Sequence, residues 1–241
     1  MANDEPFRFK QFDIYHHKCA MKVGTDGVLL GAWCQAEGAD RALDIGTGSG
    51  VIALMLAQRN PKCIVDALET DYPSCIQAAG NAACCPWKSR VTIHHISFQE
   101  FYRQTGNTYD LIVTNPPYFQ NSYPGPSAGR AAARHARSLS MHDLIDGACT
   151  LLNPRGRYSM IMPVPEAMKF IAVAGERELY CRKITSVLPN PGKPPKRLLL
   201  EFSLEEGGII RSELVIELGR RHEYSADFKS LTKDFYLDFR Y

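Results

Sequence analysis

Residues 44–50 have the types and the spacing of a ligand-binding turn, because they follow the pattern D-x-G-x-G-x-G. An apolar run over 41–45 leads into this turn, and strong helix formers follow it over 51–59. Glycine lets the backbone approach a ligand closely, and the first N–H groups of a helix have no partner within the helix. We therefore expect a strand, a turn and a helix that bind a small polar ligand through Asp44, Gly46, Gly48 and Gly50.

A carboxylate closes the next apolar run, where 63–69 ends in Glu69. A dinucleotide fingerprint, G-x-G-x-x-G, would need glycine where this chain has Val51, so the pattern disfavours a nicotinamide oxidoreductase. The glycine pattern and Glu69 together resemble motif I and the acidic residue of class I methyltransferases, which use S-adenosylmethionine. The resemblance implies that Glu69 binds both ribose hydroxyls of this cofactor and that Asp44 lies near its methionine end. For the glycine pattern alone, an ordinary turn before a helix is the alternative.

A second motif, Asn115-Pro116-Pro117-Tyr118, follows directly on the apolar run 109–114. The side-chain oxygen of Asn115 and the carbonyl of Pro116 can each accept a hydrogen bond from an amino group attached to a ring. Such bonds hold the nitrogen closer to tetrahedral and direct its lone pair at a sulfonium methyl group, while two prolines fix the acceptors in advance. Tyr118 offers a face on which the target base can stack, worth about 1–3 kcal/mol. A structural proline-rich turn is the alternative.

The two motifs together resemble amino-methyltransferases that act on adenine N6, on guanine N2 or on a glutamine amide. From about Phe7 to the C-terminus, the chain looks like a bacterial family of tRNA adenine-N6 methyltransferases, which modify adenine-37 of tRNA1(Val). The resemblance rests on the two motifs and on residues 21–33, 197–203 and 224–237. It implies S-adenosylmethionine as the cofactor and the anticodon loop of a tRNA as the partner.

The same resemblance implies further contacts to the cofactor. Residues 22–28 would cover it, with Lys22 and Asp26 lining its pocket, and Asn115 would touch it as well as the target. Where such enzymes commonly carry an aspartate that contacts the cofactor adenine, this chain has Ser97. Serine can still hydrogen-bond an amino group, but its side chain is shorter and uncharged.

Two stretches without acidic residues flank the predicted site, between Asp110 and Asp143 and between Glu178 and Glu201. Basic residues around a catalytic crevice suit contacts to RNA phosphates, whereas a solvated basic surface is the alternative for either stretch. The candidate RNA-binding residues are Arg130, Arg134, Arg137, Lys193, Lys196 and Arg197.

Composition sets the remaining bounds. The chain has 241 residues, 45% of them hydrophobic and 22% charged, which fits one ordinary globular domain. Its net charge of +2 does not by itself indicate nucleic acid. The eight cysteines form no C-x-x-C pair, and His16-His17-x-Cys19 has no second ligand pair, so we expect reduced thiols and no metal. Without a signal peptide or an apolar run of about 18 residues, we expect a cytoplasmic protein with no membrane span.

Alternating strands and helices predict the α/β class, with a doubly wound, mostly parallel sheet of seven strands and a short N-terminal addition. We expect residues 1–40 to form an extension over the cofactor site and 41–241 to form the class I methyltransferase domain. Asp26 is expected to cap a helix over 28–33. The predicted strands are 41–45, 63–69, 91–96, 109–114, 157–162, 183–188 and 197–204, and the main helices are 50–59, 72–83, 140–152, 165–176 and 225–236. Asp44, Glu69, Ser97 and Asn115 all fall at or just past strand ends, where ligands bind in such sheets.

Two other functions remain open on the sequence. A protein glutamine methyltransferase would use the same motif, Asn115 to Tyr118, but gives no reason for the basic stretches. A non-catalytic RNA-binding protein with this fold would have no need of the hydrogen-bond acceptors in that motif. The sequence leaves the oligomeric state open.

Overall fold

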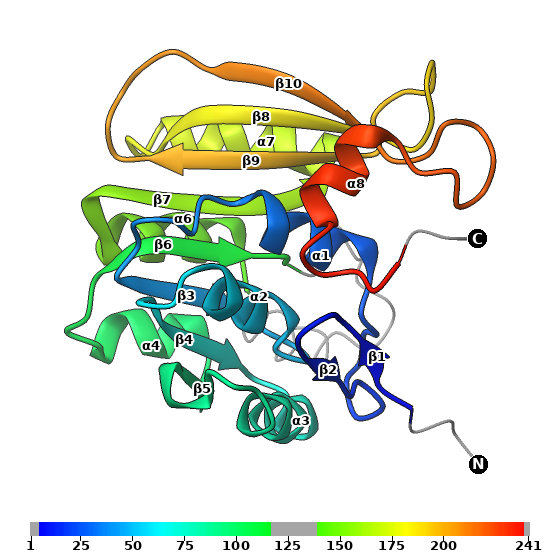
Figure 1. The fold of residues 1–241 in the computed structure, drawn as a ribbon. Coiled ribbons are helices and arrows are strands. Elements are labelled where there is room, and N and C mark those ends of the chain that lie inside the picture. Colours follow the sequence, from blue (N-terminus) through cyan, green and yellow to red (C-terminus); the bar gives the residue numbers. More distant parts are fainter. Residues whose placement is uncertain (1–4, 117–138, 239–241) are drawn as a thin grey trace, which may run out of the picture.

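An eight-stranded sheet runs through the computed structural model, which describes residues 5–116 and 139–238 (Figure 1). Neighbouring strands are parallel except at β9, which is antiparallel to both β7 and β8. The expectation of a mostly parallel α/β sheet is therefore confirmed. In spatial order the strands are β10 (Ile210–Val215), β8 (Tyr180–Leu188), β9 (Arg197–Ser203), β7 (Leu152–Pro163), β6 (Tyr109–Thr114), β3 (Arg41–Ile45), β4 (Ile64–Glu69) and β5 (Val91–His95).

The predicted number of seven strands is wrong, because β10 adds an eighth at one edge of the described sheet. It pairs in parallel with β8, from Ile210 opposite Lys183 to Val215 opposite Leu188. Its first four residues are exposed, and only Leu214 is buried. A strand that buries so little lacks the apolar alternation by which a sequence reveals strands.

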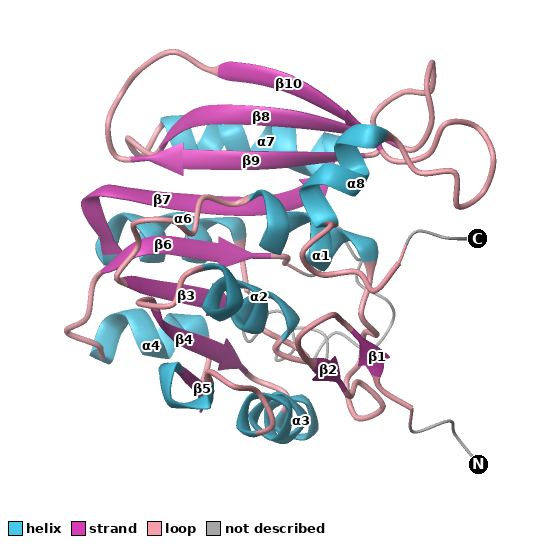
Figure 2. Cartoon of the chain, in the orientation of Figure 1, coloured by secondary structure: helices cyan, strands magenta, loops and turns pink. Residues whose placement is uncertain are grey.

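Helices cover both faces of the sheet, as Figure 2 shows. Strand residues alternate between the two faces, so that Ala42 packs with the α1 and α2 side and Leu43 with the α4, α6 and α7 side. Every helix in the described ranges is too short or too polar to cross a membrane. The helices are α1 (Thr25–Trp33), α2 (Val51–Arg59), α3 (Tyr72–Ala83), the short 3-10 helix η1 (Lys88–Arg90), α4 (Phe98–Gln104), α6 (Met141–Leu151), α7 (Val164–Gly175) and α8 (Ala226–Thr232).

The start of α1 differs from the prediction that Asp26 caps it. Gly24 is the N-cap, and no side chain caps the helix. Asp26 is the second residue of the helix, and its Oδ2 accepts a hydrogen bond from Nε of Arg197 at 2.9 Å. A strong local capping preference therefore gives way to an ion pair between distant parts of the chain.

The N-terminal segment is bound to the C-terminal segment and to α3. A short antiparallel hairpin forms from β1 (Phe7–Arg8) and β2 (Asp13–Ile14), and Phe9 bridges to Tyr236. Asn81 of α3 accepts a hydrogen bond from the N–H of Tyr15, and its amide donates to the carbonyls of Tyr15 and Ser49. Helix α1 shares one hydrophobic core with α2 and α8. The division into an extension over 1–40 and a methyltransferase domain over 41–241 stays a prediction.

Candidate active site

The glycine turn lies between β3 and α2, as the sequence predicted. Gly46, Gly48 and Gly50 have φ values of +72°, +57° and +86°, which side-chain-bearing residues rarely adopt. A Cβ atom on Gly46 or Gly48 would have no heavy atom within 4 Å, so open space lies above both residues. On Gly50, the N-cap of α2, it would lie 3.5 Å from the Cβ of Ala78. The first two glycines therefore leave room for a ligand, and the third allows close packing of α3.

Glu69 ends β4 beside this turn. Its Oε2 accepts the backbone N–H of Gly48 at 2.9 Å, and its Oε1 accepts those of Thr70 and Asp71 at 2.8 and 2.9 Å. An ionised carboxylate offers about four acceptor positions, so one remains for a ligand hydroxyl. Three hydrogen bonds from backbone N–H groups hold the carboxylate in place at the end of the strand before any ligand binds.

Asp44 is completely buried at the end of β3. Its Oδ2 accepts hydrogen bonds from Oγ1 of Thr47 at 2.6 Å and from the N–H of Ala53 at 3.1 Å. Its Oδ1 is buried and has no hydrogen-bond partner. Burial raises the pKa of Asp44 to about 7, although the bonds from Thr47 and Ala53 oppose the shift. A positively charged or hydrogen-donating ligand group beside Oδ1 would satisfy this carboxylate.

Asn115 and Pro116 follow β6 on the other side of the turn. Thr114 pairs with Ile45, and its hydroxyl donates to the carbonyl of Ile45 at 2.9 Å. Adjacent strands lie about 4.8 Å apart, so the backbone of Asn115 lies about one strand spacing from the start of the glycine turn. Asn115 is half-buried and Pro116 is buried. Pro117 and Tyr118 lie outside the described residues.

The segment that leads into α1 runs close to Glu69 and to α3. Burial raises the pKa of the Cys19 thiol, a hydrogen bond with Ser74 opposes the shift, and the negative charge of Glu69 adds to it. Lys22 is exposed, and its charge adds to the effect of burial in lowering the pKa of His16. Contacts of Lys22 and Asp26 with a cofactor stay predictions.

Ser97 has a structural task that the sequence analysis missed. It is the N-cap of α4, where its Oγ donates to the Glu100 carboxylate at 2.6 Å and accepts the Glu100 N–H at 3.2 Å. The sequence S-x-x-E at 97–100 is the pattern of such a capping box and could have revealed it. A contact between Ser97 and a cofactor adenine stays a prediction.

The predicted RNA-binding residues fall into two groups. Lys193 and Lys196 are exposed in the loop between β8 and β9, whereas Arg197 is half-buried and paired with Asp26. Arg130, Arg134 and Arg137 lie outside the described residues.

Within 5–116 and 139–238, no three His, Cys, Asp or Glu side chains gather as a metal site would require.

A mostly parallel sheet, a glycine turn after its first long strand and an acidic residue at the end of the next strand define a class I methyltransferase. Solved structures agree with this fold. A predicted O-methyltransferase from Agrobacterium tumefaciens matches with a TM-score of 0.66 over 87% of this chain and 96% of its own, at 18% identity. A methyltransferase from Pyrococcus furiosus matches with a TM-score of 0.55 over 79% and 88%, at 21% identity.

Sequence comparisons give the family. The family model described as "Methyltransferase small domain" matches residues 20–169, so the chain belongs to this family. It is 44% identical to a protein of Bacteroides thetaiotaomicron over 96% of this chain and 97% of the relative. It is also 44% identical to a protein of Trichodesmium erythraeum, over 97% and 98%. Both relatives are named tRNA1(Val) (adenine(37)-N6)-methyltransferase. The chain is a methyltransferase, and its methyl donor is S-adenosylmethionine.

Proposed function

We propose that this enzyme transfers a methyl group from S-adenosylmethionine to N6 of an adenine in tRNA, namely adenine-37 in the anticodon loop of tRNA1(Val). The observation that carries the proposal is the position of Asn115 and Pro116, one strand away from the glycine turn. The names of relatives that match almost the whole chain support the choice of substrate. Because the proposed substrate is tRNA, we propose that the enzyme acts in the cytoplasm.

The residues of the crevice suit the cofactor. The open space above Gly46 and Gly48 leaves room for the part of the cofactor that would lie against the backbone of the turn. Glu69 has one acceptor position left for a ribose hydroxyl. The unpartnered Oδ1 of Asp44 suits the amine of the methionine end, directly or through a water. When bound, S-adenosylmethionine supplies an electrophilic methyl group on a sulfonium.

The chain's own residues act on the amino group that receives the methyl. The lone pair of an adenine N6 is delocalised into the ring, so the free base is a poor nucleophile. The side-chain oxygen of Asn115 and the carbonyl of Pro116 would accept its two N–H bonds and direct the lone pair along the line of attack. The N–C bond forms as the S–C bond breaks, and the proton leaves the methylated nitrogen to solvent. No general base is needed in the transfer step.

We propose that RNA reaches this site over basic residues at the same edge of the sheet. Lys193 and Lys196 are exposed there, and the sequence adds Arg130, Arg134 and Arg137 in the stretch that begins at the second motif. Phosphate contacts make binding salt-dependent. A base in the anticodon loop is unpaired or easily splayed, so its entry into the site costs little.

The experiment is to incubate the enzyme with tritiated S-adenosylmethionine and separate pools of tRNA, rRNA, DNA and protein, and to digest the labelled pool. We expect N6-methyladenosine from tRNA, with transfer that weakens as salt rises. Asn115→Ala is the catalytic control and should lose most of the labelling. Label on protein glutamine would favour the alternative enzyme, and salt-independent labelling of a free nucleoside at equal efficiency would favour a small-molecule substrate.

A further inference from the structure

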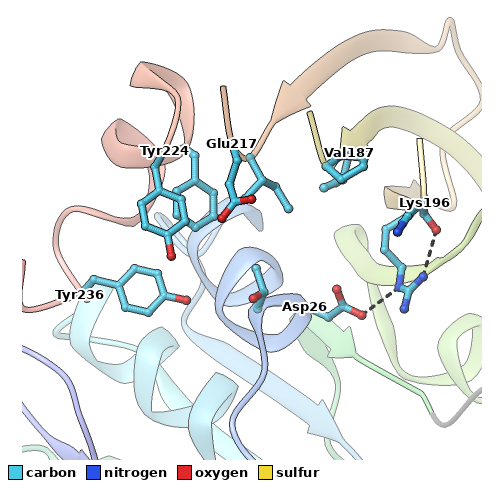
Figure 3. A pocket seen from close by; sticks show the side chains of 11 residues that line it. Asp26, Val187, Lys196, Glu217, Tyr224 and Tyr236 are labelled. Atoms are coloured by element: carbon cyan, nitrogen blue, oxygen red, sulfur yellow. Dashed lines mark hydrogen bonds and ion pairs between the residues drawn. The ribbon is translucent and has the colours of Figure 1, made fainter. Parts of the chain in front are cut away.

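A cavity, drawn in Figure 3, opens where β8 and β10 end. The strand order places it at the same end of the parallel strands as the glycine turn, but beyond β7 from that turn. It has a volume of ≈ 250 Å³. We call it the β8/β10 pocket, because it lies where β8 and β10 end and β9 begins. Its lining includes Asp26, Lys196, Arg197, Glu217, Tyr224 and Tyr236.

Aromatic rings and charged groups both line this pocket, and in Figure 3 the carboxylate of Glu217 lies beside the ring of Tyr224. The ring of Tyr224 stacks on Phe228 with centroids 4.9 Å apart and planes at 19°, and Phe228 lies 6.2 Å from Tyr236. In Figure 3 the hydroxyl groups of Tyr224 and Tyr236 point into the space between these rings and Asp26. Opposite them, Arg197 is paired with Asp26, and the neighbouring Lys196 is exposed.

This combination of groups fits a nucleotide better than other ligands. Aromatic side chains stack with any base, because every base has a π-face. The carboxylate of Glu217, already held by the N–H of His222 at 2.8 Å, can accept the amino group of a base. Lys196 lies at the same pocket and can reach a phosphate. The volume is below the ~300–1,000 Å³ of typical small-molecule sites, so one base fits better than a whole cofactor.

The pocket lies beside the methyl-transfer site but does not coincide with it. Arg197 pairs with Pro163 at the end of β7, and β7 is the neighbour of β6. Two strand spacings, about 10 Å, therefore separate Arg197 from β6, the strand that leads into Asn115. A single-stranded RNA whose target base is at Asn115 can place a neighbouring, splayed base at this distance.

We propose that the β8/β10 pocket binds the base of a nucleotide next to the methylated adenine, with Tyr224 as a stacking residue and Lys196 on the phosphate. The proposal rests on the proposed RNA substrate and deepens it. The pocket would hold the RNA in register, so that the correct adenine meets Asn115. It would also explain a preference for a folded loop over a free nucleoside.

The test uses an RNA hairpin with the sequence of the anticodon arm, and versions in which one nucleotide within three positions of the target is abasic. Binding is measured in the presence of S-adenosylhomocysteine for the wild type and for Tyr224→Leu. We expect one neighbouring abasic position to weaken wild-type binding about 10-fold or more, the scale of one lost stacking contact. Tyr224→Leu should weaken binding of the intact hairpin to the same degree and should be insensitive to that abasic position.

Two further variants distinguish a lost RNA contact from a general disturbance of the fold. Lys196→Ala changes an exposed side chain and should reduce the salt dependence of binding by about one phosphate contact, with S-adenosylhomocysteine affinity unchanged. The matched control Tyr180→Leu lies at the opposite end of β8 and should keep the full sensitivity to the abasic position.

Three outcomes would overturn the inference. The effects of the abasic nucleotide and of Tyr224→Leu could simply add, no neighbouring position could matter to the wild type, or the lost sensitivity could fall on the target position itself. In each case, N6-methyladenosine formed in the intact hairpin would leave the proposed function standing. A wild type that neither binds nor methylates the hairpin would contradict the proposed function instead.

Discussion

Oε2 of Glu69 accepts the backbone N–H of Gly48 at 2.9 Å, so the acidic residue at the end of β4 holds the glycine turn at the end of β3. The other oxygen of the same carboxylate accepts the N–H groups of Thr70 and Asp71, which lead into α3. One side chain therefore fixes the turn and the start of the next helix relative to each other. A ligand hydroxyl bound to Glu69 would meet a carboxylate that is already in place.

The first prediction concerns this carboxylate. Glu69→Ala should weaken the binding of S-adenosylmethionine by about 1.5–3 kcal/mol, the scale for a lost hydrogen bond to a charged group. Isothermal titration calorimetry measures the change, with Glu176→Ala at the exposed end of α7 as the matched control. Equal affinities for wild type and Glu69→Ala would exclude the ribose assignment.

The second prediction concerns the amino group that receives the methyl. Asn115→Ala should reduce kcat by roughly 10²–10³-fold, the scale for removing one positioned polar group, while cofactor affinity changes little. Asn115→Asp keeps an acceptor oxygen and should recover part of the loss. Single-turnover assays with saturating tRNA separate the chemical step from product release. Turnover near the wild-type value in Asn115→Ala would show that the amine is positioned by other groups.

The third prediction concerns the buried carboxyl of Asp44, whose pKa burial raises to about 7. Between pH 4 and 7 the folded protein keeps a proton that the unfolded chain has released, so this group costs stability as pH rises. The cost reaches at most about 4 kcal/mol at pH 8. Asp44→Asn should therefore stabilise the free enzyme against urea most at pH 8, and less towards pH 5.

The same Asp44→Asn substitution should weaken S-adenosylmethionine binding, because the NH2 group that takes the place of the unpartnered Oδ1 donates hydrogen bonds and cannot accept one from the cofactor amine. A gain in stability with a loss of affinity is the expected pair of results. A stabilisation that grew towards acid pH would contradict the raised pKa.

The fourth prediction concerns a polar cluster at Asp66 in the middle of β4. Burial alone would raise the pKa of Asp66, but hydrogen bonds from His94, Tyr109 and Arg41, at 2.8, 2.9 and 2.9 Å, outweigh it and leave the pKa below its usual value. Its contribution to stability is therefore full above about pH 4 and is lost as pH falls through the lowered folded-state pKa.

Asp66→Asn should reduce the free energy of unfolding at pH 7 by about 2–4 kcal/mol, because donors around a buried site lose their charged acceptor. It should also flatten the fall in stability between pH 5 and pH 3. Urea unfolding over this range measures both effects, and Asp13→Asn, at an exposed position of β2, is the control. An unchanged slope in Asp66→Asn would contradict the lowered pKa.

The sequence determined the local parts of this enzyme. The turn at 44–50 needs positive φ at three positions, which glycine supplies, so its pattern is visible in the chain itself. Glu69 and Asn115 are found in the same way, because Glu69 ends one apolar strand, Asn115 directly follows another, and parallel strands end at one side of the sheet.

Only the tertiary structure decided which distant residues meet. Asp26 pairs with Arg197 across 171 positions, so a predicted helix cap and a predicted phosphate contact became partners. The β8/β10 pocket joins the start of α1 to the ends of β8 and β10, to the start of β9 and to α8. Those meetings follow from the spatial order of the strands, with β9 between β7 and β8 and with β10 at the edge, and local periodicity carries no information about that order.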